Sequence, residues 1–265
     1  MRVSAAIWIV LSLSVSPVRA GDLEDGVRFY GAKDYARAIN SWQKAAAQGD
    51  AAAQFALGFL YEKGEGVEKD YQQAVSWYQK AADKGNAAAQ ANLGVMYERG
   101  LGISRDNKQA AAWYQKAAEQ GIAEGQFNLG RMYQTGQGVA QDYKQAASWF
   151  QKAGDQGHVW AQSNLGTMYE TGQGVPLDYK QAVAWYTKAA DNGDALAQFS
   201  LGRIYEAGQE GVPLDYIEAH KWWNIAAVNG DDRARRSRDI VERSMKPEQV
   251  VEAKRRASEW QKTHK

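Results

Sequence analysis

The sequence predicts an all-α fold built from repeated pairs of helices, and three observations carry that prediction. A Leu-Gly dipeptide returns every 36 residues, and a tyrosine follows each leucine by four positions. Apolar side chains inside each copy keep the three- and four-residue spacing of an amphipathic helix. Capping residues and glycines recur where two helices per copy would begin and end. The five dipeptides are Leu57-Gly58, Leu93-Gly94, Leu129-Gly130, Leu165-Gly166 and Leu201-Gly202.

In the first full copy, the earlier helix is predicted over about residues 51–62, with Leu57 on its apolar face. The second helix is predicted to start after Asp70, whose carboxylate can accept hydrogen bonds from the first turn. Gly85 suits the left-handed residue that ends such a helix. One helix pair cannot bury its apolar face alone, so we expect the pairs to stack around a continuous core.

The repeats predict three segments: a leader, a solenoid over residues 21–232 and a C-terminal helical cap over residues 233–265. A partial copy covers about residues 26–50. The full copies, called here the first to fifth repeats, cover about 51–86, 87–122, 123–158, 159–194 and 195–231. The fifth repeat carries one extra residue, "GQEGV" where others read "GQGV". The cap should hold two helices, broken before Pro247.

The leader, residues 1–20, has the pattern of a secretory signal peptide with cleavage after Ala20. Arg2 precedes an apolar run over residues 5–15, and small residues precede the cleavage position. An uncleaved anchor is the alternative, but the run of about 11 residues is shorter than the about 20 needed to cross a bilayer. We therefore expect export to the periplasm, with secretion from the cell as the alternative.

Composition and charge exclude some classes of function. The 265 residues include no cysteine, so a disulfide framework or a cysteine-based metal site is impossible. The net charge of +1 gives no bulk attraction to nucleic acid, and the export signal also argues against that partner. Residues 233–265 hold 11 basic and 5 acidic residues, against 19 and 26 in residues 21–232. The cap is either a solvated basic face or a dock for an acidic partner.

No catalytic, cofactor or metal site is predicted. The three histidines, His158, His220 and His264, have no partner in a known catalytic motif. The aspartates that precede each second helix could form a row of carboxylates, but their position identifies them as helix caps. The Gly-x-Gly segments lack the strand-turn-helix setting of a dinucleotide loop. The tryptophans of the second helices are expected to fill gaps in the core.

The repeated pattern A-Q-x-x-L-G-x-x-Y-x-x-G-x-G-V-x-x-D-Y-x-x-A-x-x-W-Y-x-K-A-A-x-x-G resembles the Sel1-like repeat, a relative of the tetratricopeptide repeat. The resemblance covers about residues 26–232. Asn107, Phe150, Trp223 and Asn224 depart from it. It implies a right-handed α-solenoid with a concave face, and adaptor or scaffold roles, often in bacterial envelopes. Some relatives are linked to β-lactam binding, but those are rich in cysteine and this chain has none.

The candidate partner-binding site is a stripe on the first helices, which the resemblance places on the concave side. Aromatic residues and arginine are typical interface anchors. The alternative is that the phenylalanines, which share one register, pack between neighbouring helices. The candidate residues are Phe55, Phe59, Val95, Phe127, Arg131, Thr167, Phe199 and Arg203.

The expected function is that of a monomeric, non-catalytic periplasmic adaptor, scaffold or regulator that binds proteins or peptides on its concave face. It needs no cofactor. One alternative is an enzyme or binding protein of cell-wall or β-lactam chemistry, which would need a deep polar pocket with a nucleophile and a base. Another is a secreted effector that binds a host protein.

Overall fold

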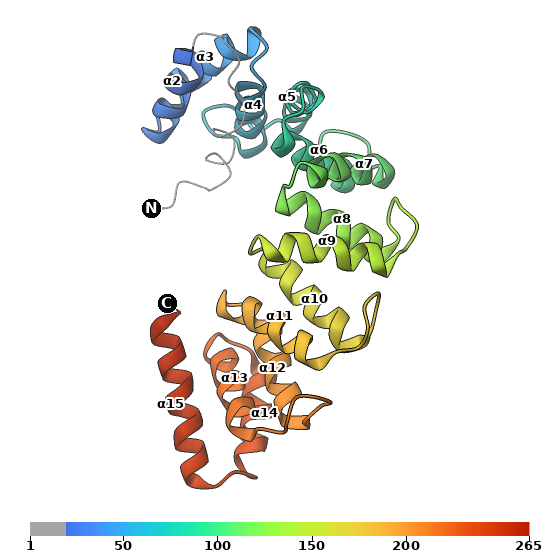
Figure 1. Ribbon diagram of the computed structural model, residues 1–265. Coiled ribbons are helices and arrows are strands. Elements are labelled where there is room, and N and C mark those ends of the chain that lie inside the picture. The colour runs from blue at the N-terminus through green and yellow to red at the C-terminus, as the bar shows by residue number, and fades with distance from the viewer. Residues whose placement is uncertain (1–19, 265) are drawn as a thin grey trace. The chain divides into compact units, whose positions relative to one another are not determined.

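The computed structural model describes residues 20–264, and this part of the chain forms fourteen α-helices and no β-strand. The predicted all-α architecture of consecutive helix-turn-helix repeats is confirmed (Figure 1). The predicted signal peptide lies outside the described residues, except for Ala20, the first residue of α2. It stays a prediction.

The helices are short and nearly uniform in length, as a repeat of 36 residues requires. First helices carry even numbers and second helices odd numbers, and two further helices, α14 and α15, follow the last repeat. They are α2 Ala20–Gly31, α3 Tyr35–Ala47, α4 Ala51–Lys63, α5 Tyr71–Asp83, α6 Ala87–Arg99, α7 Asn107–Glu119, α8 Ala123–Thr135, α9 Tyr143–Asp155, α10 Val159–Thr171, α11 Tyr179–Asp191, α12 Ala195–Ala207, α13 Tyr216–Val228, α14 Asp232–Glu242 and α15 Pro247–Thr263.

The chain divides into two compact units, Met1–Ala140 and Gln141–Lys265. The first unit holds α2 to α8, and the second holds α9 to α15. Each unit is described by itself below.

Aspartate caps start the second helices, as predicted. In α5 the Asp70 carboxylate accepts hydrogen bonds from the backbone N–H groups of Gln72 and Gln73, at 2.8 and 3.0 Å. The first helix α4 is capped in the same way by Asp50, which accepts from Ala53. Such caps satisfy N–H groups that have no partner inside the helix, and each is worth about 1 kcal/mol.

In four of the five Leu-Gly pairs, at Gly58, Gly94, Gly166 and Gly202, the glycine lies directly against an aromatic ring of the second helix. A Cβ atom added to Gly94 would lie 2.6 Å from the ring of Tyr114, and one added to Gly166 would lie 2.7 Å from the ring of Tyr186. At Gly202 the neighbour is the indole of the fifth repeat, Trp223. The dipeptide therefore recurs because only glycine lets the two helices of a repeat approach this closely.

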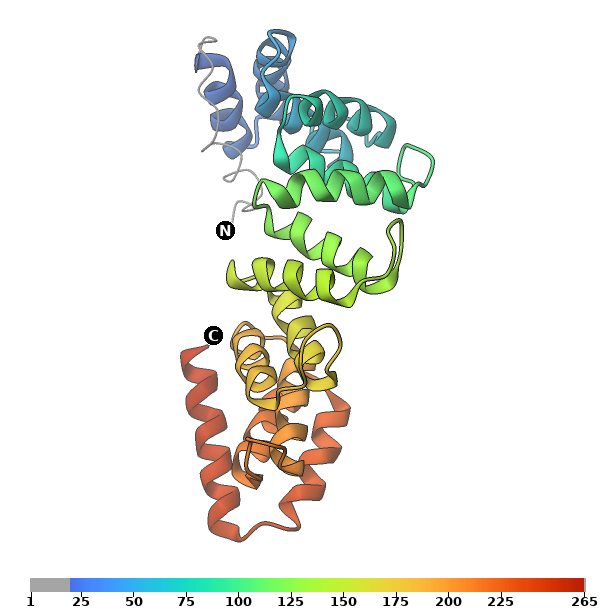
Figure 2. The same cartoon turned by 45° about the vertical axis from the view of Figure 1, so that its right-hand side comes forward.

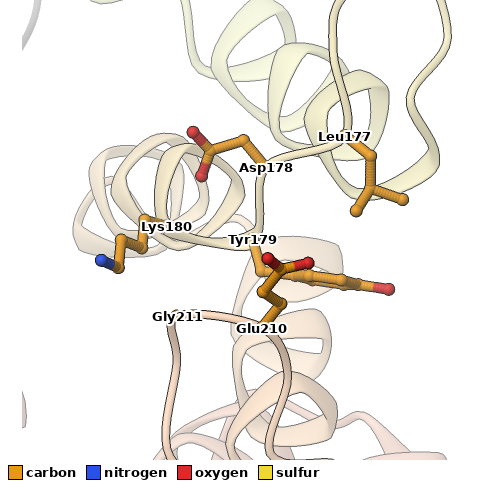
Figure 3. A pocket seen from close by; sticks show the side chains of 6 residues that line it. All are labelled: Leu177, Asp178, Tyr179, Lys180, Glu210 and Gly211. Atoms are coloured by element: carbon orange, nitrogen blue, oxygen red, sulfur yellow. The ribbon is translucent and has the colours of Figure 1, made fainter.

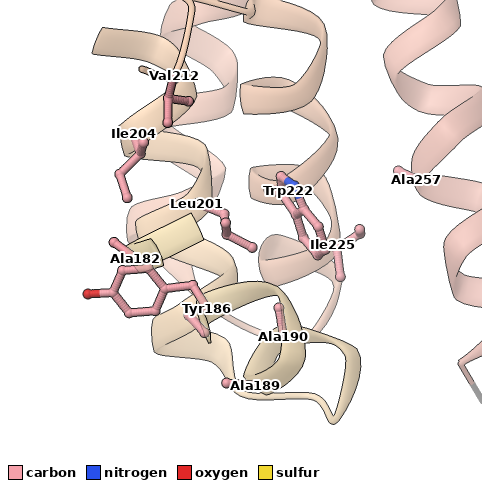
Figure 4. Packing of buried hydrophobic residues seen from close by; sticks show 11 residues of the cluster. Ala182, Tyr186, Ala189, Ala190, Leu201, Ile204, Val212, Trp222, Ile225 and Ala257 are labelled. Atoms are coloured by element: carbon pink, nitrogen blue, oxygen red, sulfur yellow. The ribbon is translucent and has the colours of Figure 1, made fainter. Parts of the chain in front are cut away.

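The core of the second unit shows how the repeats pack. Figure 4 shows Tyr186 of α11, Leu201 of α12, and Trp222 and Ile225 of α13 in one buried cluster, which Ala257 of α15 also joins. Tryptophans of the second helices are packing residues, as expected. Trp113, Trp149 and Trp185, which share one register, are 5–8% exposed, and each has a lysine ammonium at 3.7–3.9 Å from its ring centroid.

The cap packs on α13, which lies between α14 and α15 (Figures 1 and 2). Trp260 of α15 donates its indole N–H to the Asp191 carboxylate of α11 at 2.9 Å. The fully buried His220 of α13 contacts Glu242 of α14 through Nε2 at 3.0 Å. Lys254 of α15 holds the same carboxylate at 3.1 Å, so Glu242 joins three helices.

Candidate interaction surface

The candidate stripe does not form one exposed surface, because its first phenylalanines are buried. Phe55 is 3% exposed, and its ring centroid lies 5.6 Å from that of Tyr78, in a cluster that includes Leu93 of the next repeat. Phe127 is 9% exposed. These two residues belong to the core and present no surface to a partner, which is the alternative that the pattern left open.

Phe199 and Phe59 are partly buried, each beside a cation of the same chain. The Arg233 guanidinium from the start of α14 lies 4.8 Å from the Phe199 ring centroid, and the Trp223 indole donates to the Phe199 carbonyl at 3.1 Å. The Lys63 ammonium lies 5.4 Å from the Phe59 ring centroid. The cap therefore covers part of the stripe at its C-terminal end.

The two arginines of the stripe connect consecutive repeats. In the first unit, the Arg131 guanidinium donates to Glu98 Oε1 at 2.5 Å, and the Tyr114 hydroxyl donates to the other oxygen of that carboxylate at 2.8 Å. Burial, then the charge of Glu98, raises the pKa of the Tyr114 hydroxyl well above its usual range, so the phenol stays a neutral donor.

The second unit contains an equivalent tie, a glutamate that pairs with an arginine of the next repeat and accepts a hydrogen bond from a tyrosine hydroxyl. Arg203 pairs with Glu170 of the preceding repeat, and the Tyr186 hydroxyl donates to the same carboxylate at 2.8 Å. Thr167, another stripe residue, meets this hydroxyl at 2.9 Å. The Glu170 side chain is 10% exposed and Arg203 is 52% exposed. Each arginine thus pairs with a mostly buried carboxylate, and only the outer edge of the arginine side chain is open to a partner. Val95, the one candidate residue not yet described, is partly buried.

The large apolar side chains that are exposed in the described part of the chain all belong to the second unit, and the stripe predicted from the sequence does not include them. Leu196 is 50% exposed and Val228 is 66% exposed. They replace small or charged residues: Leu196 stands where the first repeat has Ala52, and Val228 stands where it has Asp83. Such departures from the repeat were the available signal. Among the described residues, the exposed large apolar side chains are Trp160, Leu177, Leu196, Leu214, Val228, Ile240 and Val251.

A cavity of about 310 Å³ lies where the fifth-repeat loop faces the start of α11 (Figure 3). Glu210, the inserted residue of that loop, and Gly211 form one side. Leu177 and Tyr179 contribute apolar surface, and Leu177 is 52% exposed. The remaining lining residues are Asp178 and Lys180. The cavity is open, its lining is both polar and apolar, and its volume lies at the lower end of the range for small-ligand sites.

Within residues 20–264, no cluster of three or more histidine, aspartate or glutamate side chains is arranged to hold a metal ion. The same part of the chain contains no helix with the length and apolarity to span a bilayer.

The Sel1 repeat family model matches residues 21–50, 51–86, 87–122, 123–158, 161–194 and 195–231. A solved structure of c5321, described as a protective antigen of uropathogenic Escherichia coli with an SLR fold, is 39% identical with a TM-score of 0.81. The alignment covers 90% of this chain and 53% of that one, so this chain spans about half of its relative.

A Sel1 repeat protein from Oxalobacter formigenes is also 39% identical, with a TM-score of 0.75, and 80% of this chain and 87% of that chain are covered. Among curated proteins, none matches. The chain belongs to the Sel1-repeat family, whose members generally act as scaffolds for protein–protein interaction.

Proposed function

We propose that this chain is a non-catalytic adaptor of the bacterial periplasm that binds partner proteins or peptides mainly through its second compact unit. The observation that carries the proposal is the set of large apolar side chains exposed on that unit. Leu196, Val228 and Val251 are each at least half exposed, whereas the first unit exposes no comparable side chain among its described residues. Exposed apolar groups gain free energy when a partner covers them and removes their surface from water.

The helical scaffold supports this role because its binding elements are held in place before a partner arrives. Caps such as Asp194, which accepts from Ala197 at 2.7 Å, define the ends of the helices. Ties such as the pair of Glu170 and Arg203 join one repeat to the next. A rigid surface loses little conformational entropy on binding, and this loss is a main cost of association.

The periplasmic location rests on the leader pattern of residues 1–20. Fractionation of cells that express the full chain tests it, together with the N-terminal sequence of the mature protein. Recovery from the periplasmic fraction with a new N-terminus at Gly21 is the expected result. Retention in the cytoplasm with Met1 in place would refute the location.

Partner binding is tested by crosslinking the mature protein in envelope extracts beside two variants. One changes Leu196 and Val228 to serine, and the matched control changes the exposed polar residues Gln72 and Gln145 of second helices to serine. Circular dichroism checks that all three fold. We expect a protein captured by the parent and the control to be lost from the apolar variant. Equal capture by all three would contradict the assignment of the surface.

A further inference from the structure

The loops between the helices of a repeat normally close tightly on the preceding repeat. In the second, third and fourth repeats, the second glycine of Gly-x-Gly lies against the backbone at the first residue of the preceding second helix. A Cβ added to Gly102 would lie 2.3 Å from the carbonyl oxygen of Tyr71, and one added to Gly174 would lie 2.2 Å from that of Tyr143. Both glycines have positive φ, near +70°. No side chain fits between loop and helix at these positions.

The fifth repeat breaks this arrangement because its loop contains one residue more. Gln209 and Val212 exchange two backbone hydrogen bonds of 2.8 Å, which makes the longer loop a tight turn with Glu210 and Gly211 at its tip. Gly211 now faces the aliphatic part of Lys180 rather than the backbone of Tyr179. The inserted residue thus leaves the cavity of about 310 Å³ between this loop and the start of α11.

The first repeat shows which group suits such a position. There the Lys69 ammonium lies 4.7 Å from the ring centroid of Tyr71, the first residue of α5. Tyr179 is the same position of the fourth repeat, but Leu177 stands in place of that lysine. Lys69 thus supplies a cation to the Tyr71 ring, whereas within residues 20–264 no lysine or arginine lies over the Tyr179 ring.

The charges around the cavity also favour a cation. The structure gives the Glu210 carboxylate no hydrogen bond or ion pair with any other described residue, and Asp178 adds a second carboxylate that caps α11 through Gln181. Lys180 is the one basic residue of the lining, and Figure 3 shows its side chain directed away from Tyr179 and Glu210. The N-terminus of α11 carries a partial positive charge, but this does not prevent the binding of a cation, because the Lys69 ammonium occupies the equivalent position at the N-terminus of α5.

We propose that this cavity binds an arginine side chain of a partner protein. Its guanidinium would lie over the Tyr179 ring and pair with Glu210, and Leu177 would contact its methylene groups or an adjoining apolar side chain. Cation–π contact, a carboxylate partner and an apolar wall are the features that arginine uses at interfaces. The inference rests on the proposed adaptor function and adds the chemistry that the partner presents.

The test is a titration of the ¹⁵N-labelled mature protein, residues 21–265, with N-acetylarginine amide. N-acetylcitrulline amide, which has nearly the same shape without the charge, is the control ligand. We expect saturable shifts of the backbone amide signals of Lys180 and Gly211 with the arginine probe, at millimolar concentration because a single side chain binds weakly. The citrulline probe should bind about tenfold more weakly or not at all.

Three variants place the binding in this cavity. Deletion of Glu210 restores the loop length of the other repeats, and Glu210→Gln keeps the insertion without its charge. Leu177→Lys supplies an internal cation, as the first repeat does. We expect each to weaken arginine binding about fivefold or more. Leu214→Lys is the matched control, because Leu214 has the same register in the next repeat and lies outside the cavity lining, and it should change binding less than twofold.

Equal affinity for both probes, shifts confined to other residues, or unchanged affinity in all three variants would overturn the proposal. Binding of the small probe does not depend on the capture of a partner protein. If the protein binds the arginine probe but captures no partner, the arginine site is supported and the adaptor function is not. If it captures a partner but does not bind the probe, the adaptor function is supported and the arginine site is not.

Discussion

Substitution of Gly166 by alanine tests whether the glycine of the Leu-Gly pair is required for close packing against an aromatic ring. The added Cβ would lie 2.7 Å from the Tyr186 ring, whereas an ordinary contact needs at least about 3.4 Å, so the ring must move by roughly 0.7 Å. Tyr186 is 1% exposed, and its hydroxyl is held by Glu170 and Thr167, so the ring has little freedom to move.

The expected magnitude combines two opposing effects. Overpacking of a well-ordered core costs about 1–3 kcal/mol, and replacement of glycine inside a helix contributes about 1 kcal/mol in the other direction. Because the Tyr186 hydroxyl is held by Glu170 and Thr167, we take the upper part of the overpacking range, about 2–3 kcal/mol. We therefore expect Gly166→Ala to lower the free energy of unfolding by about 1–2 kcal/mol. Urea denaturation followed by circular dichroism measures the change.

The same unit offers a control substitution for which no loss of stability is expected. Gly154 lies inside α9, where the first, second and fourth repeats have alanine, and its added Cβ would meet Trp185 at 3.1 Å and the flexible side chain of Gln162 at 3.3 Å. Gly154→Ala should therefore be neutral or stabilise by up to about 1 kcal/mol. A Gly166→Ala protein at least as stable as the parent would refute the reasoning.

Three further predictions concern the ties and the cap. Arg203→Ala should lower the free energy of unfolding by only about 0.5–1 kcal/mol, because the arginine is half exposed. Glu170→Ala should lower it by about 2 kcal/mol, because the Tyr186 hydroxyl also loses its carboxylate partner. Urea denaturation measures both changes, and equal values would contradict the shared role of the carboxylate. Burial lowers the pKa of His220 in the folded protein, so the imidazole is protonated at a higher pH in the unfolded chain, and stability should fall as the pH drops below about 6.5. Thermal unfolding at pH 7.5 and 5.5 should show a weaker pH dependence in His220→Val than in the parent. An unchanged dependence would exclude the histidine as its source. Trp260→Phe removes the hydrogen bond to Asp191 and should speed amide hydrogen exchange in α15 by about threefold to tenfold, while exchange in α12 stays unchanged. Equal protection of α15 in the parent and the variant would show that this bond does not hold the cap.

Much of the fold could be predicted because its signals are local and repeated. Asp70 marks the start of α5, and Pro247 is the first residue of α15, as the sequence indicated. Both signals act within one helical turn, so a short window of sequence contains all the physics that is needed. The division of the chain after Ala140 has no such local signal and was not predicted.

The interaction surface was harder to predict because helical spacing does not tell which neighbour a side chain meets. Phe55 and Arg131 both belong to the same nominal stripe, yet Phe55 is core and Arg131 reaches a carboxylate 33 residues earlier in the chain. The pairing of Glu98 with Arg131 depends on how two repeats stack, which the spacing inside one helix cannot show. Exposed residues such as Leu196 were detectable only as departures from the other repeats.

The ties between glutamate and arginine also set the step by which this protein could be lengthened. Glu98 and Glu170 are 72 residues apart, and so are Arg131 and Arg203, whereas the third repeat carries Gln134 at the glutamate position. Copying that single repeat in place would set an arginine opposite a glutamine and leave it without its carboxylate. Copying the second and third repeats together would carry a complete tie with every insertion. For engineering purposes, the building block is a double repeat.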